Sequence, residues 1–292
     1  MSIQFQGRVA IVTGAGGGLG REHALALASR GAKVVVNDLA AADAVVEQIR
    51  AAGGQAIASA ASVTDFDAVR AMVEQALAAW GRVDILVNNA GILRDKSFGK
   101  MDLADFRLVM DVHLMGAVHC CKAVWETMRQ QQYGRIVMTT SSSGLYGNFG
   151  QANYGAAKMA LVGLMQTLAI EGEKSGIRVN SLAPTAHTRM TEGLMPEAVL
   201  QAFRPEAVTP GLLYLASENA PTRAILCAGA GTFARAYVTM TQGVHLGMGP
   251  EVPEQVAQSF EAISDRAHGE IVPAAGSAQG QNELAQAAQR VA

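Results

Sequence analysis

The chain has 292 residues, of which 50% are hydrophobic and 16% charged, and its formal net charge at pH 7 is -2. This length suffices for one large α/β domain with a substantial core, and the near-neutral charge excludes the clustered basic surface of a nucleic-acid-binding protein. The chain has three cysteines, and because none has C-x-x-C spacing we expect no metal site. It has no apolar run long enough to cross a bilayer and no signal peptide. We therefore expect a cytoplasmic protein without a membrane partner.

Short apolar runs alternate with longer amphipathic segments along most of the chain. The runs are RVAIVT (8–13), AKVVVN (32–37), VDILVN (83–88), GRIVMTT (134–140) and IRVNSLA (177–183). Helices are expected between them, at 19–30, 65–80, 103–131 and 152–173. This alternation predicts an α/β fold with a doubly wound parallel sheet, because strands buried on both faces read as continuous apolar runs.

The pattern is less regular after about residue 184. We expect a short mobile helix over 188–204, a helix near 206–219 and a last strand near 224–229. From Val272 onwards the sequence VPAAGSAQGQNELAQAAQRVA is rich in Ala, Gln, Gly and Ser, with little to bury. Residues 272–292 are therefore expected to be flexible or to pack on a partner subunit.

A glycine-rich stretch, VTGAGGGLGREHALALASRG, follows the first strand and opens the first helix. Gly14, Gly18 and Gly20 form the pattern T-G-x-x-x-G-x-G, in which Leu19 separates the last two glycines. Glycines allow the backbone to approach a phosphate closely, and the helix N-terminus directs N–H groups and a positive dipole end towards it. The alternative is a tight turn that binds nothing.

Asp38 ends the second strand, eighteen residues after Gly20. An acidic residue at this spacing can accept hydrogen bonds from the ribose hydroxyls of a bound dinucleotide, and its charge repels a 2′-phosphate. Neither the glycine turn nor the residues just after Asp38 contain an Arg or Lys. NAD is therefore favoured over NADP; the alternative is a solvated loop carboxylate.

One tyrosine of the chain, Tyr154, is followed by a lysine, Lys158, at a spacing of four residues within SSSGLYGNFGQANYGAAK (141–158). On a helix this spacing places both side chains on one face. A phenol with a pKa near 10 needs nearby positive charge to act as a base at neutral pH. The pair is thus either a proton-transfer device or two polar residues that share a helix face.

The glycine turn, the acidic residue, NNAG (88–91) and Y-x-x-x-K, in this order, resemble the short-chain dehydrogenase/reductase family over roughly residues 5–245. The resemblance implies a single NAD-binding Rossmann catalytic domain, which we place at 1–271 with an extension from about residue 231. It also implies about seven parallel strands with helices on both faces, and a homodimer or homotetramer.

The resemblance assigns cofactor-side roles to the NNAG motif. It implies that Asn88 and Asn89 brace the central sheet and border the ribose of the nicotinamide. Ala90 and Gly91 would let the cofactor lie close to the backbone.

Two departures from the family pattern concern the cofactor. Where the family commonly has an Asp beside a Val to hold the adenine, this chain has Ser62 and Val63, so a weaker hydrogen bond is expected. In LAPT (182–185), Thr185 replaces the glycine of a Pro-Gly pair. The segment that follows would cover the nicotinamide, with Thr188 near its carboxamide.

The resemblance also implies the catalytic group. Tyr154 is the acid/base, Lys158 supplies positive charge and holds ribose hydroxyls, and a serine thirteen residues before the tyrosine, Ser141, orients the substrate oxygen. Ser142 and Ser143 are rivals that otherwise only line the loop. His113 stands where the family has an Asn in an N-x-x-G pattern, and either takes over its water-binding role or is a satisfied buried histidine.

A closer resemblance is to the (3R)-hydroxyacyl-CoA dehydrogenase branch that forms part of peroxisomal type 2 multifunctional enzymes and is also described as a 17β-hydroxysteroid dehydrogenase. It rests on NAGILRDKSF, DVHLMG, GLYGNFGQANYGAAK and the stretch after the last strand, GAGTFARAYVTMTQGVHLGMGPEVPEQVAQSFEAISD. We therefore expect a free-standing enzyme that oxidises (3R)-hydroxyacyl-CoA to 3-ketoacyl-CoA. Candidates for an apolar substrate slot are Leu145, Tyr146, Phe149, Met190, Leu194 and Met195, and candidates for contact with CoA phosphates are Arg94, Lys96 and Arg189.

Three other functions stay open. A dehydrogenase for steroids or other secondary alcohols would share the same motifs. A 3-ketoacyl-carrier-protein reductase would normally use NADPH, against which Asp38 argues. From a different class, an NAD-binding sensor or assembly subunit without turnover is disfavoured by the presence of Ser141, Tyr154 and Lys158.

Overall fold

The apolar runs predicted as strands form the central sheet of the computed structural model, which describes residues 2–186, 202–267 and 269–289. In β1, VAIVT, every residue is buried, as expected of a strand covered on both faces. The strands of this sheet are β1 (Val9–Thr13), β2 (Lys33–Asn37), β3 (Gln55–Ser59), β4 (Ile85–Asn88), β5 (Gly134–Thr139), β6 (Ile177–Thr185), β7 (Ile225–Gly229) and β8 (Thr232–Ala236).

The strand order is β3-β2-β1-β4-β5-β6-β7-β8, and β1 to β7 pair in parallel. The chain runs outwards from β1 to β3 and then returns to the other side of β1 with β4. In such a sheet ligands bind outside the carboxyl ends of the strands where the order reverses. The predicted doubly wound sheet of about seven parallel strands is confirmed, and its switch point lies between β1 and β4.

The eighth strand was not predicted. Only Ala230 and Gly231 separate β7 from β8, and both have positive φ angles, 49° and 71°. A two-residue turn of this kind reverses the chain into a hairpin. The β8 sequence, TFARA, is largely exposed and has no apolar run, so sequence periodicity did not reveal it.

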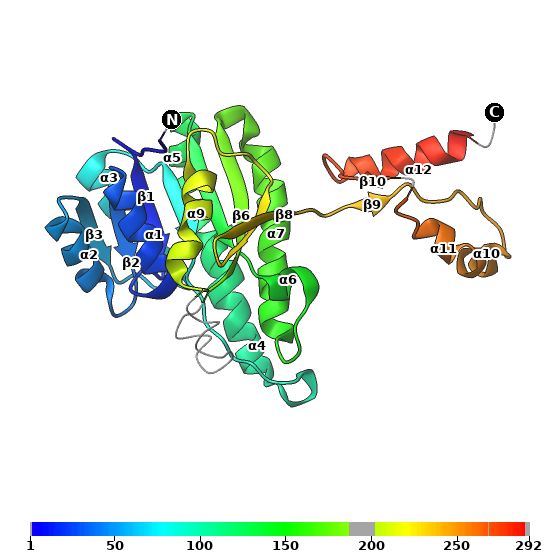
Figure 1. The fold of residues 1–292 in the computed structure, drawn as a ribbon, viewed down its shortest axis with the longest axis horizontal. Helices are drawn as coiled ribbons and strands as arrows, with labels where there is room; N and C mark the ends of the chain where they lie inside the picture. The colour runs from blue at the N-terminus through cyan, green and yellow to red at the C-terminus, as the bar shows by residue number, and fades with distance from the viewer. Residues whose placement is uncertain (1, 187–201, 268, 290–292) are drawn as a thin grey trace. The chain divides into compact units, whose positions relative to one another are not determined.

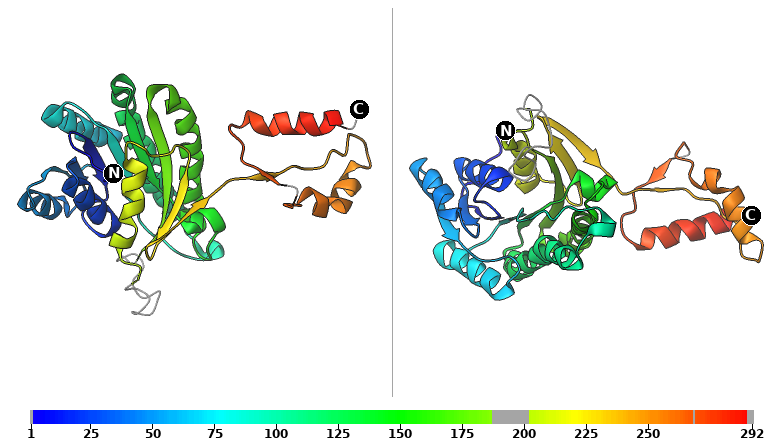
Figure 2. Two further views of the ribbon diagram at one scale, coloured as in Figure 1. Left: turned by 45° about the horizontal axis from the view of Figure 1, so that its top comes forward. Right: turned by 90° about the horizontal axis from the view of Figure 1, so that it is seen from below.

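Helices cover both faces of this sheet (Figures 1 and 2). On one face α1 packs against α2 and α9 over a shared apolar core, and elsewhere α3 packs on α5 and α4 on α7. These helices are α1 (Gly18–Ser29), α2 (Ala42–Ala51), α3 (Phe66–Trp80), α4 (Leu103–Met110), α5 (Gly116–Gln131), α6 (Ser142–Tyr146), α7 (Ala152–Gly172) and α9 (Thr209–Ala216). The predicted helices are confirmed to within a few residues, except that most of 188–204 lies outside the described residues.

The predicted helix 103–131 consists of α4, a π-helical turn η2 (Asp111–Met115) and α5. By length and composition alone, Leu103–Gln131 could cross a membrane. However, Val109, Ala117, Val124 and Met128 are buried, and α5 packs against β4 and β5. Packing on the sheet thus accounts for the buried part of this segment, which is 39% of its most apolar window.

The chain divides into two compact units, Met1–Arg235 and Ala236–Ala292. The second unit contains the antiparallel pair β9 (Met240–Thr241) and β10 (Glu270–Ile271), together with α10 (Val252–Gln258), α11 (Phe260–Ile263) and α12 (Ser277–Gln289). The predicted tail from residue 272 therefore includes a helix. A single catalytic domain over 1–271, followed by a flexible or partner-packed tail, stays a prediction.

Candidate active site

The glycine turn joins β1 to α1 at the switch point of the sheet. Gly14 has a φ of +62°, and a Cβ on it would lie 2.8 Å from Cα of Ala90. A Cβ on Gly20 would lie 2.2 Å from the carbonyl oxygen of Gly14. The first turn of α1 contains no acidic residue, and no side chain caps its N-terminus. Because no side chain caps α1, the N–H groups of its first turn can bind the diphosphate of a dinucleotide.

Asn89 and Thr13 hold this turn against the loop that follows β4. The side-chain amide of Asn89 donates to the carbonyl oxygens of Thr13, at 2.9 Å, and Gly14, at 3.1 Å. In return, the hydroxyl of Thr13 accepts the backbone N–H groups of Asn89 and Ala90. Asn89 thus ties the loop after β4 to the end of β1 and to the glycine turn, and its place beside the ribose stays a prediction. Sequence reasoning missed Thr13, although it is the first residue of the T-G-x-x-x-G-x-G pattern.

Asp38 reaches the glycine turn from the end of β2. One carboxylate oxygen accepts the backbone N–H of Gly16 at 3.1 Å, and the other accepts those of Ala40 and Ala41. A Cβ on Gly16 would lie 2.6 Å from Cγ of Asp38, so glycine is needed for this contact. The carboxylate is therefore fixed beside the turn rather than free in a loop. Gly16 was missed, and its only sequence signal is the unbroken run of three glycines.

Ser62 and Val63 follow β3, at the carboxyl end of the strands, as the glycine turn and Asp38 do. The hydroxyl of Ser62 is 2.8 Å from that of Thr64. Val63 packs close to the first residue of α5, Gly116, where a Cβ would lie 2.7 Å from the Val63 side chain. Nδ1 of His119 lies 2.8 Å from the carbonyl oxygen of Val63. The segment expected to face the adenine is thus anchored to α5.

His113 lies in the π-helical turn and fills the space over Gly91, where a Cβ would lie 2.2 Å from Cε1 of the imidazole. Its Nε2 lies 2.8 Å from the oxygen and 3.1 Å from the nitrogen of the Ile92 backbone. Burial, followed by the positive charge of Lys158, lowers the pKa of His113 to about 3. The imidazole is therefore neutral at physiological pH.

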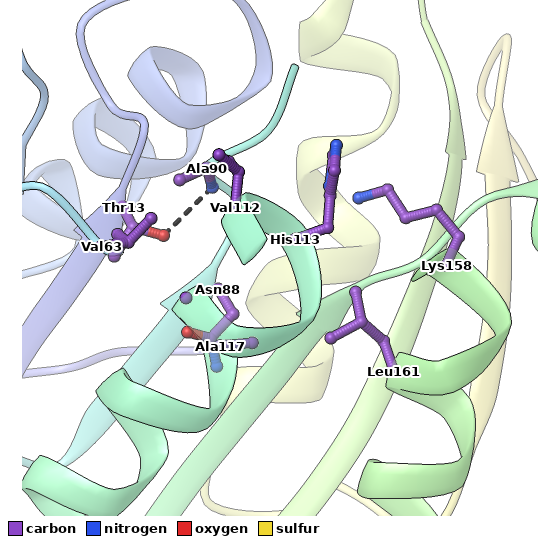
Figure 3. A pocket seen from close by; sticks show the side chains of 10 residues that line it. Thr13, Val63, Asn88, Ala90, Val112, His113, Ala117, Lys158 and Leu161 are labelled. Atoms are coloured by element: carbon purple, nitrogen blue, oxygen red, sulfur yellow. Dashed lines mark hydrogen bonds between the residues drawn. The ribbon is translucent and has the colours of Figure 1, made fainter. Parts of the chain in front are cut away.

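A small cavity adjoins this histidine (Figure 3). Asn88, Ala90, His113 and Lys158 are among its lining residues, and the amine of Lys158 points towards the imidazole. The side-chain oxygen of Asn88 and Nδ1 of His113 are buried and have no partner among the described residues. Both atoms can hydrogen-bond a small polar molecule, which favours the predicted water-binding role over a fully satisfied buried histidine.

Tyr154 and Lys158 project from the first two turns of α7. The rings of Tyr154 and His113 meet edge to face, with centroids 5.2 Å apart, and Nζ of Lys158 lies 5.4 Å from the centre of the Tyr154 ring. Nζ also donates to the carbonyl oxygen of Thr139 at 2.6 Å. The structure thus brings His113, Tyr154 and Lys158 together, as the sequence predicted.

Ser141 is the serine whose side chain acts on that of Tyr154, because it lowers the pKa of the phenol. Its Oγ also accepts the backbone N–H of Ser143 at 3.2 Å, which caps the short helix α6. A Cβ on Gly144 would lie 2.8 Å from Cβ of Lys158, so this glycine allows α6 to pack directly on α7. Gly144 was missed, although it directly follows the serine run.

The electrostatics of this group are dominated by burial. Burial raises the pKa of Tyr154 above its ordinary value, the hydrogen bond with Ser141 lowers it, and the carboxylate of Asp95 raises it. Burial also lowers the pKa of Lys158 to about 7, so its charged and neutral forms coexist near neutral pH. Lys158 was expected to lower the pKa of Tyr154, but burial has the largest influence on this pKa in the structure, and it acts in the opposite direction.

The remaining predicted residues are only partly described. Thr185 ends β6 and is exposed, whereas Thr188, Arg189, Met190, Leu194 and Met195 lie outside the described residues. Tyr146 and Phe149 are exposed, and Leu145 is half-buried on α6. Arg94 forms an ion pair with Asp105 at 3.6 Å, and Lys96 is exposed.

Comparison with known proteins identifies the family. The short chain dehydrogenase family model matches residues 8–198. Peroxisomal multifunctional enzyme A of Dictyostelium discoideum is 46% identical over 90% of this chain and 61% of its own length. Full-length peroxisomal multifunctional enzyme type 2 of Drosophila melanogaster superimposes with a TM-score of 0.84, at 39% identity, over 99% of this chain and 51% of that structure.

The chain thus spans between half and two thirds of these two longer proteins. A 7α-hydroxysteroid dehydrogenase solved with NADH and a 7-oxo bile acid also superimposes, with a TM-score of 0.73 at 32% identity, over 78% of this chain and 95% of that one. The protein belongs to the short-chain dehydrogenase/reductase family and is an oxidoreductase that acts on CH–OH groups with a nicotinamide cofactor.

Proposed function

We propose that the protein oxidises (3R)-hydroxyacyl-CoA to 3-ketoacyl-CoA with NAD as the cofactor. The observation that carries the chemistry is the convergence of Ser141, Tyr154 and Lys158, the last of which lines the same cavity as Thr13 at the start of the glycine turn. The acyl-CoA substrate is supported by the likeness to multifunctional enzymes over 90% of the chain, including the region after β7.

In this proposal the glycine turn and Asp38 would hold NAD, which would supply the hydride acceptor for the carbinol carbon. Tyr154, as the phenolate, accepts the proton of the substrate hydroxyl, and the Ser141 hydroxyl orients that oxygen. The ammonium of Lys158, whose Nζ lies 5.4 Å from the centre of the Tyr154 ring, stabilises the phenolate electrostatically and can also hold the ribose hydroxyls. The neutral His113 orders the water through which the proton leaves the site.

The stereochemistry of turnover tests the substrate. Purified protein with NAD is expected to oxidise (3R)-hydroxyacyl-CoA and to leave the (3S) form unchanged, as measured by NADH absorbance at matched short and long chain lengths. Equal rates on both forms would contradict the proposal. If neither form is oxidised although NAD binds, the substrate would be another alcohol, or the protein would be an NAD-binding sensor.

A steroid is the second candidate substrate. The supporting observation is the likeness to the 7α-hydroxysteroid dehydrogenase, which the chain matches over 95% of that structure. Hydroxysteroids offered in the same assay separate the two, because the preferred class has the higher kcat/KM.

The choice of NAD over NADP is proposed from Asp38 and the exposed Leu39 beside it. The double variant Asp38→Ala/Leu39→Arg is expected to shift the ratio of kcat/KM for NADP over NAD by at least about tenfold, about 1.4 kcal/mol. The reason is that it removes a charge that repels the 2′-phosphate and adds one that attracts it.

The single variant Leu39→Arg is the control for this experiment. It adds the same cation but keeps the carboxylate, so its ratio should change less than that of the double variant. An unchanged ratio in the double variant, at an unchanged Tm, would refute the role of Asp38.

A further inference from the structure

Asn153 directly precedes Tyr154 and is completely buried. Gln151, at the N-cap of α7, contributes no side-chain bond to the helix end. Instead, Oδ1 of Asn153 accepts the backbone N–H of Tyr154 at 2.7 Å. This contact satisfies one of the N–H groups that a first helical turn leaves without a partner, and it does so at the residue with the acid/base role.

The other end of the same amide reaches a distant part of the chain. Nδ2 of Asn153 donates to the carbonyl oxygen of Arg94 at 2.9 Å, across 59 residues of sequence. Two further hydrogen bonds run alongside: Lys96 N–H donates to the carbonyl of Gly150, and the Gln151 amide donates to Asp95. The segment 92–96, which follows NNAG, is thus tied to the start of α7.

The segment 92–96 also holds Tyr154 from a second side. The backbone of Ile92 contacts Nε2 of His113, and the ring of His113 meets that of Tyr154 edge to face. Asn153 and His113 therefore connect one backbone segment to the main chain and the ring of the same tyrosine. A buried amide with both ends bonded to backbone fixes geometry, and an apolar side chain of similar size would leave both backbone groups unpaired.

We infer that Asn153 is a positioning residue that fixes Tyr154 relative to segment 92–96 and so sets the rate of the proton-transfer step. The inference rests on the acid/base role proposed for Tyr154. Misplacement of a reacting group by about 1 Å can cost about a hundredfold in rate, so the contact has a measurable consequence. The glycine turn and Asp38 have no hydrogen bond to Asn153, so cofactor binding is expected to be independent of it.

The test compares Asn153→Ala with a matched control, Asn180→Ala. Asn180 is equally buried, and its amide also bridges two backbone groups, the Pro221 carbonyl at 2.7 Å and the Ala224 N–H at 2.9 Å, but it joins β6 to the start of β7. Both variants should lower Tm. Asn153→Ala alone should lower kcat, by about ten- to a hundredfold, while the Kd for NADH stays within about threefold of the wild type.

Two results would overturn the inference. One is a kcat for Asn153→Ala no lower than that of Asn180→Ala. The other is a loss of NADH affinity as large as the loss of kcat, because that would indicate general damage to the site.

Asn153→Asp decides the matter if the alanine variant does not fold. It is nearly isosteric and keeps an acceptor for the Tyr154 N–H, but it loses the donor to Arg94. The highest kcat in the pH profile of this variant should be lower than that of the wild type by about tenfold or more. An equally high kcat in the two proteins would overturn the inference.

The assay uses whichever alcohol the wild type oxidises, so a wrong substrate class does not affect the outcome. If Tyr154→Phe retains its rate, the proposed mechanism fails. If Tyr154→Phe is inactive and Asn153→Ala is normal, only the positioning role fails.

Discussion

Replacement of Tyr154 by phenylalanine is expected to lower kcat by about a hundred- to ten-thousand-fold while NADH binding stays near that of the wild type. Phenylalanine keeps the ring, and with it the edge contact to His113 and the packing near Lys158. Only the hydroxyl, on whose pKa Ser141 acts, is lost. The measurements are steady-state NADH production and the fluorescence of bound NADH.

Tyr214→Phe is the control for this substitution. Tyr214 lies on α9, is partly exposed and has no part in the predicted site, so loss of its hydroxyl should leave kcat unchanged. If Tyr154→Phe kept half of the wild-type rate, Tyr154 could not be the acid/base.

The second large effect concerns acid stability and arises from two buried histidines. Burial lowers the pKa of His23 from 6.5 to about 3, and burial together with Lys158 does the same to His113. The unfolded chain takes up protons at these side chains below pH 6.5, whereas the folded protein does so only near pH 3. Folding stability is therefore fully present above pH 6.5 and is lost as the pH falls towards 3, by about 1.4 kcal/mol per pH unit for each histidine.

His23→Gln isolates one of these contributions without touching the site. Nδ1 of His23 lies 3.0 Å from the hydroxyl of Thr209, and a glutamine amide can still donate there. Between pH 7.5 and pH 5 the variant should lose about 2 kcal/mol less free energy of unfolding than the wild type. Urea denaturation at both values measures this, and the pH 7.5 difference supplies the cost of the substitution itself. Parallel losses in the two proteins would contradict the prediction.

Local patterns were sufficient for the strands, most of the helices and the main motifs. A strand buried on both faces must be apolar throughout, so VAIVT and its counterparts were readable without tertiary information. The glycine turn and the Tyr154–Lys158 pair are likewise defined by spacing within one or two turns of backbone. The order of these motifs along the chain was enough to place the protein in its family.

Contacts between distant parts of the chain were decided by the tertiary structure. Asp38 meets the N–H of Gly16 across 22 residues, and Asn153 meets Arg94 across 59. Such pairs have no local signature, because they depend on which strand ends and loops the sheet order brings together. The hairpin of β8 and the π-helical turn under His113 belong to the same class.

The protonation behaviour of the site was also a tertiary property. The sequence by itself determined which titratable groups share the site, and it predicted that Lys158 would lower the pKa of Tyr154. Burial instead raises the pKa of Tyr154 and lowers that of Lys158 to about 7. The physical reason is that desolvation depends on everything packed around a group, which no motif contains, whereas the spacing of the two side chains on one helix is contained in the sequence.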